Sequence, residues 1–113
     1  LLVGAVVVTV GHFLMAVPGL LPDLVEARSG VPVGAALAAS TTPLGTLAPP
    51  TLDAATTARL GLDAGAVETV ARAAFLTTAS FYAALACIAL GAGLMIAAGT
   101  ALIGDHYAPD DPR

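Results

Sequence analysis

Four amino acids are missing from the sequence altogether: it contains no lysine, asparagine, glutamine or tryptophan. Charge is scarce too, with four arginines and eight acidic residues, or 11% of the chain against about 25% in a typical soluble domain. Because a compact chain of 113 residues leaves much of its surface facing solvent, so few charges exclude a soluble monomer. The net charge of −4 argues against a nucleic-acid-binding protein, so we expect no nucleic-acid partner.

Cysteine is nearly absent as well, and Cys87 is the only one in the sequence. A single cysteine excludes an intramolecular disulfide and a zinc site built on paired cysteines. Alanine and glycine are abundant instead, with 26 and 12 copies, and beside the missing lysine and asparagine they are typical of a GC-rich genome. Hydrophobic residues make up 58% of the chain, and the mean hydropathy is +0.91. The composition therefore predicts a membrane protein.

The first apolar run covers residues 1–21 and contains no fully charged side chain. As a helix it would rise roughly 31 Å, enough to cross a hydrocarbon core of about 30 Å. Pro18 and Pro22 favour a bend or fraying near its end. A cleaved signal peptide is the rival interpretation, but no basic stretch is visible, and the run is longer than the usual signal-peptide core. The run predicts a first transmembrane helix.

The second apolar run, residues 73–104, would rise roughly 48 Å as a helix, well beyond the thickness of the hydrocarbon core. Either this helix tilts, or its first turns stand outside the membrane. We favour the second interpretation, because Asp63 is a suitable N-cap and the hydroxyl-rich stretch 77–82 suits a membrane interface. The helix is therefore expected to begin near residue 63 and to cross the core over about 83–104.

Between the two runs, the stretch 40–50 is rich in threonine and proline and predicts extended or turn structure. The flanking stretches 33–39 and 52–60 are candidates for short helices. The predicted fold class is all-α, an integral membrane helical hairpin whose two transmembrane helices are joined by a region with short helices. Its predicted parts are a transmembrane helix at 1–21, an extramembrane region at 22–72, a second transmembrane helix at 73–104 and an acidic C-terminal tail at 105–113.

His12 is the one histidine inside a predicted span, and ionisable residues at membrane depth are rare and often functional. A neutral imidazole there would hydrogen-bond a neighbouring helix, or would ligate a haem iron or the magnesium of a chlorophyll-type pigment. Met95 would oppose His12 as a second haem ligand only if the hairpin paired at mid-depth. Helix packing without a cofactor is the expected role, and haem or pigment ligation is the alternative. No spacing of metal ligands is present, so we predict no metal site.

Small residues recur at helical spacing in both spans, where missing side chains let helix backbones approach closely. The candidate helix-packing residues are Gly4 and Gly11 in the first span, and Ala83, Cys87, Gly91, Gly93, Ala97 and Gly99 on two rows of the second. The two rows give the second helix two faces of small residues, and covering both faces takes at least two neighbouring helices, of which the first span supplies one. We therefore expect the chain to pack in the lipid bilayer against other integral membrane subunits or its own copies. Chance placement in an alanine-rich chain is the competing explanation.

No catalytic constellation or phosphate-binding glycine loop is present, so the sequence predicts that the protein is not an enzyme. Neither span contains the Asp or Glu that a small proton-coupled exporter or an ion-translocating ring needs. The best-supported function is a small accessory subunit of a larger integral membrane complex. The first alternative is a haem- or pigment-binding electron-transfer or light-harvesting subunit that uses His12. The second is a self-associating small membrane pore.

The predicted location is the cell membrane, crossed twice, and the side on which the central region lies depends on two opposing signals. Arg28, Arg59 and Arg72 favour the cytoplasm by the positive-inside rule. The threonine-, proline- and alanine-rich composition without lysine is typical of an exported segment. We place the region on the extracytoplasmic side, with the cytoplasmic side as the alternative.

Overall fold

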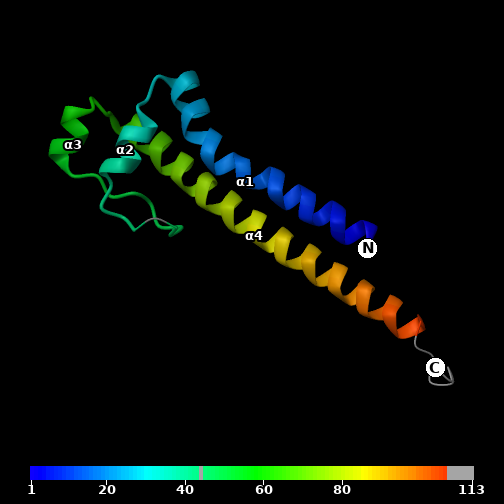
Figure 1. Cartoon of the computed structure of the whole chain (residues 1–113). Coiled ribbons are helices and arrows are strands. Elements are labelled where there is room, and N and C mark those ends of the chain that lie inside the picture. The colour runs from blue at the N-terminus through cyan, green and yellow to red at the C-terminus, as the bar shows by residue number, and fades with distance from the viewer. Residues whose placement is uncertain (44, 107–113) are drawn as a thin grey trace.

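The computed structural model describes residues 1–43 and 45–106, and all regular structure in those residues is helical. The helices are α1 (Leu2–Ser29), α2 (Val33–Ala39), α3 (Ala54–Arg59) and α4 (Ala64–His106). α1 and α4 run side by side in opposite directions in an elongated hairpin of 78 × 24 × 16 Å, and α2 and α3 gather at its turning end (Figure 1). The predicted all-α class with two long apolar helices is confirmed.

α1 extends beyond the predicted first span, because the helix continues past residue 21 to Ser29. Pro18 and Pro22 both lie inside it. A proline removes one backbone donor and bends a helix without having to end it, and the last turns of α1 diverge from α4 (Figure 1). The helix ends at Gly30, whose φ of 70° suits glycine and whose N–H donates to the Glu26 carbonyl at 2.8 Å.

α4 is one uninterrupted helix of 43 residues. Asp63 caps its first turn, because its Oδ1 accepts the backbone N–H of Ala66 at 2.7 Å. The helix rises roughly 65 Å, about twice the thickness of a hydrocarbon core. α1 and α4 are both long and apolar enough to cross a membrane by length and composition. Unless α4 tilts steeply, only part of it fits inside a bilayer.

The two long helices approach most closely at four residues, which we name the glycine seam: Gly4, Gly11, Ala84 and Gly91. A Cβ built on Gly4 would lie 2.9 Å from the Gly91 carbonyl oxygen, and one on Gly91 would lie 2.8 Å from the Gly4 carbonyl oxygen. At Gly11 the obstacle is the carbonyl oxygen of Ala84, at 3.0 Å. Because backbone atoms leave no room for a side chain at Gly4, Gly11 or Gly91, the seam depends on glycine at these three positions.

The turning end packs differently, around a hydrophobic cluster that we name the cap core. Its buried members are Val33, Ala36, Leu62, Val70 and Ala73. Leu21 and Val25 of α1 pack against this cluster, so α2 contributes to a small core that lies between the end of α1 and the start of α4. The divergence of α1 after its prolines makes room for this arrangement.

The predicted short helices are both present, as α2 and α3, and the stretch between them is irregular in its described residues. We name residues 41–51 the Thr/Pro loop. Its ends are tied together, because Thr41 N–H donates to the Thr51 carbonyl at 3.2 Å and the two hydroxyls lie 2.8 Å apart. Its tip reaches α4, where the Tyr82 hydroxyl donates to the Gly45 carbonyl at 2.6 Å. The loop is thus fixed at its base and at its tip.

Candidate functional site

The glycine seam contains three of the predicted helix-packing residues, Gly4, Gly11 and Gly91, and all three are buried. Their opposite neighbour Ala84 is also buried, with no exposed surface, and was not singled out from the sequence. The predicted rows used i, i+4 steps, which advance about 40° around a helix each time, whereas seven-residue steps drift only about 20°. Ala84 and Gly91 are seven residues apart, like Gly4 and Gly11, which places each pair on nearly the same face of its helix.

The other predicted packing residues on α4 lie away from α1. Ala83, Gly93 and Ala97 are exposed, and Cys87 and Gly99 are partly exposed. A Cβ built on Gly93 or Gly99 would meet no other atom within 4 Å. α1 therefore covers only one side of α4, and packing of the second side against further helices stays a prediction.

His12 is exposed on the surface of α1. Its Nδ1 lies 2.8 Å from the carbonyl oxygen of Val8, one turn earlier in the same helix. The suggestion that Met95 opposes His12 is wrong, because Met95 lies against Gly4, and a Cβ there would be 2.7 Å from Met95 Cγ. The antiparallel register places Met95 about 12 Å along α1 from His12. Among the described residues, no three His, Cys, Asp or Glu side chains cluster as a metal site would require.

A shallow hollow of about 90 Å³ lies between the Thr/Pro loop and α4. Hydroxyl side chains from both elements line it, among them Thr42, Thr46 and Thr78. Thr77 also lines it, although its Oγ1 is buried and has no hydrogen-bond partner. Gly45, which also lines the hollow, accepts the hydrogen bond from Tyr82, a contact that joins residues 37 apart and has no local sequence signal.

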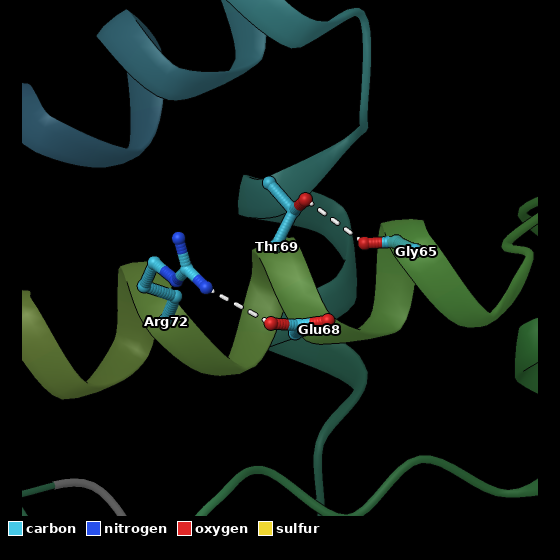
Figure 2. Close-up of polar contacts among 4 residues, drawn as sticks. All are labelled: Gly65, Glu68, Thr69 and Arg72. Atoms are coloured by element: carbon cyan, nitrogen blue, oxygen red, sulfur yellow. Dashed lines mark hydrogen bonds and ion pairs between the residues drawn. The ribbon is translucent and has the colours of Figure 1, made fainter.

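A second groove separates the end of α1 from the first turns of α4, with Val25 on one side and Leu76 on the other. Figure 2 shows its polar rim, where Arg72 Nη2 and Glu68 Oε1 are 2.9 Å apart and the Thr69 hydroxyl donates to the Gly65 carbonyl at 2.9 Å. The Arg72 and Glu68 side chains are 73% and 71% exposed, so this i, i+4 pair contributes at most about 0.5 kcal/mol. It supports the helix and provides no catalytic group.

Comparison with known protein families identifies a match. The model of the POT family (PTR2) matches residues 1–113, which is the whole sequence. No curated protein and no solved structure matches the chain. The predicted acidic tail at 105–113 falls inside the family match, although its residues 107–113 lie outside the described structure.

Proposed function

The chain belongs to the POT family, whose members are membrane transporters, and we propose that it forms a helical hairpin of such a transporter. The match over the whole sequence is the observation that carries this proposal. The two long helices support it, because large apolar side chains on them face outward: Phe13, Leu90 and Ile96 are 76%, 67% and 69% exposed. Such surfaces suit a lipid bilayer or the helices of a membrane protein.

Within the transporter, we propose that the hairpin has a structural role and holds neighbouring helices in place. The runs 1–22 and 73–104 carry no Asp, Glu, Lys or Arg, so charged groups for substrate or ion binding would come from other helices. Ala83, Gly93 and Ala97 form a smooth, uncovered surface that suits close packing of another helix. The sequence analysis expected a separate small accessory subunit, and the family match leads us to propose a structural role within a transporter in its place. POT family members are transporters rather than enzymes, consistent with the prediction that the protein is not an enzyme.

The two alternative functions gain no support. His12 is engaged with its own helix through Val8, and Met95 packs elsewhere, so no observation favours a haem- or pigment-binding subunit. None favours a self-associating pore. The cell membrane location and the two crossings belong to the proposal, and so does the extracytoplasmic side for residues 22–72.

Membrane insertion is tested by alkaline carbonate extraction of cells that express the full chain. The proposal expects the chain to stay with the membrane pellet, and its release into the aqueous fraction would overturn the proposal. The side of the central region is tested with an Ala55→Cys variant in a Cys87→Ala background. Labelling of intact cells by a membrane-impermeant maleimide is expected, and labelling only after lysis would place this region in the cytoplasm.

Packing within the transporter is tested with a photo-activated cross-linking amino acid at Ala97, on the uncovered side of α4. Cross-links to helices of a POT family transporter are expected there, whether those helices are on the same polypeptide or on another one. The matched control places the same amino acid at Ala55, on the exposed surface of α3, where no such product is expected. Equal products at both positions would argue against a specific helix interface.

A further inference from the structure

The Thr/Pro loop and α4 meet at a distinct point in the sequence of α4. Tyr82 ends the hydroxyl-containing stretch 77–82, and the stretch that follows over 83–104 is uncharged, with a hydroxyl only at Thr100. The hydrogen bond from Tyr82 to the Gly45 carbonyl, 2.6 Å long, brings the loop tip to this transition. The loop therefore extends along α4 as far as the beginning of the apolar stretch and is held there.

The exposed backbone of the loop limits how deep it can lie. Most described residues of the loop are exposed, and their backbone groups are not paired in a helix or a sheet. Irregular backbone that faces lipid does not occur in the hydrocarbon region, because unsatisfied N–H and C=O groups there are too costly. The core must therefore begin beyond Tyr82, and the 22 residues of 83–104 would rise roughly 33 Å, close to the core thickness of about 30 Å.

The chemistry of the loop suits the bilayer surface rather than bulk water. No charged residue occurs anywhere in 29–52, and Leu47 is 52% exposed. Beside the loop tip, Tyr82 is 48% exposed and packs edge to face against Phe81, with ring centroids 5.8 Å apart. Aromatic rings with a polar atom are enriched at headgroup depth, and exposed threonine hydroxyls can bond to lipid headgroups and interfacial water.

We propose that the Thr/Pro loop lies on the bilayer surface, with Leu47 in the interfacial layer and Tyr82 marking the edge of the hydrocarbon core. This inference rests on the proposed membrane insertion of α1 and α4. It has a consequence for α1: because Gly11 faces Ala84, Phe13 lies level with Tyr82. The turns of α1 around Leu20 then stand outside the core and need protein to cover Leu20, which is 57% exposed. Residues 1 to about 13 of α1 remain inside the core, a rise of roughly 20 Å, so residues 1–21 do not by themselves make the full crossing predicted from the sequence.

The depth of the loop is measured with the fluorophore NBD attached to single cysteines in a Cys87→Ala background. The three variants are Leu47→Cys in the loop, Ala55→Cys in α3 and Ile96→Cys in α4, each reconstituted in phosphatidylcholine vesicles. Lipids with a nitroxide high on the acyl chain are expected to quench position 47 most strongly, and lipids with a deep nitroxide to quench position 96. Position 55 should be quenched only by aqueous iodide.

Each pattern of quenching decides the question. If position 47 behaves like position 55, the loop lies in water, and if it behaves like position 96, the loop enters the core; both results overturn the inference while leaving membrane insertion intact. If position 96 is also quenched by iodide alone, membrane insertion fails and the inference fails with it.

The role of Tyr82 is tested by Tyr82→Phe, which keeps the ring and removes the hydroxyl that donates to Gly45. We expect position 47 to lose its shallow quenching and become accessible to iodide, while position 96 is unchanged and shows that the hairpin is still inserted. Unaltered quenching at position 47 would show that Tyr82 does not hold the loop at the surface.

Discussion

At the glycine seam, α1 and α4 meet through three glycines and one alanine, whereas at the cap core they meet through larger side chains, with α2 between them. The seam brings the Gly4 and Gly91 backbones so close that a Cβ on either would lie within 3 Å of the other's carbonyl oxygen. In the cap core, Val33 and Val70 are completely buried. One pair of helices thus uses two kinds of packing along its length.

The difference corresponds to the solvent that each end is proposed to face. In water, burial of large apolar side chains is the main driving force for packing, so a core of valine and leucine is effective. In lipid, side chains gain little by leaving an equally apolar solvent, and helices associate instead through close backbone approach. The seam lies within the uncharged stretches 1–22 and 73–104, and the cap core lies at the end with Glu68 and Arg72, which agrees with a hairpin that is partly in and partly out of the membrane.

The largest expected effect comes from filling the seam with Gly91→Ile. Its Cβ would meet the Gly4 carbonyl oxygen at 2.8 Å and the Val8 backbone nitrogen at 2.8 Å, and neither backbone atom can move aside cheaply. We expect the free energy of unfolding to fall by about 3 kcal/mol. The measurement is a denaturant titration of the purified chain in mild detergent.

Gly93→Ile is the matched control, because it makes the same substitution two residues away, where a Cβ meets nothing within 4 Å. It should leave the free energy of unfolding of the isolated hairpin nearly unchanged. If a further helix packs on that side of α4, the substitution should also reduce assembly of the transporter in membranes. Equal loss of stability for both variants would show that helix propensity, rather than seam contact, explains the effect.

A smaller loss is expected from Val70→Ala in the cap core. The substitution removes two methyl groups from a side chain with no exposed surface, which should cost about 2 kcal/mol. Val6→Ala, at a position 55% exposed on α1, is the control and should change stability by less than about 0.5 kcal/mol. If the two ends differ as proposed, the Val70→Ala loss persists when detergent is replaced by lipid, because the cap core stays in water. A loss that disappears in lipid would place the cap core inside the bilayer.

The sequence predicts the two long helices, the short helices and the need for close packing, because these depend on local composition and spacing. It does not predict how far α1 continues, since Pro22 permits a bent helix as readily as a helix end. It also misses Ala84, because only the register of two helices distinguishes that alanine from its neighbours. The contact between Tyr82 and Gly45 depends on the path of an irregular loop over 37 residues, which no local pattern specifies.

A still smaller effect is expected from Asp63→Ala, which removes the cap of α4 at the start of the cap core. The Asp63 Oδ1 accepts the Ala66 N–H at 2.7 Å, and loss of such a cap costs about 1 kcal/mol. Hydrogen exchange should increase at the first amides of α4, around Ala66, and stay unchanged at Val8 beside the seam. The Asp63→Asn variant is the control, because it retains a capping oxygen and should preserve most of the protection. Faster exchange at both ends would mean that the two ends unfold as one unit.

The smallest expected effect is a response to pH, which should alter α3, through Asp53, and leave the glycine seam unchanged. The Thr56 side chain, and then its backbone N–H at 2.6 Å from Asp53 Oδ1, hold the pKa of this carboxyl below its ordinary value of 3.8. A carboxyl whose pKa is lowered by folding stabilises the folded state above the unfolded pKa, and this stabilisation disappears as pH falls through the folded pKa. Below about pH 4 we therefore expect the protection factor of the Thr56 amide, the exchange rate of an unstructured amide at the same pH divided by its own, to fall progressively, with no such change at Val8. In an Asp53→Asn variant the pH dependence at Thr56 should vanish. If the pH dependence at Thr56 persists in this variant, a titratable group other than Asp53 causes it. The different pH responses of α3 and the glycine seam would then be assigned to that group.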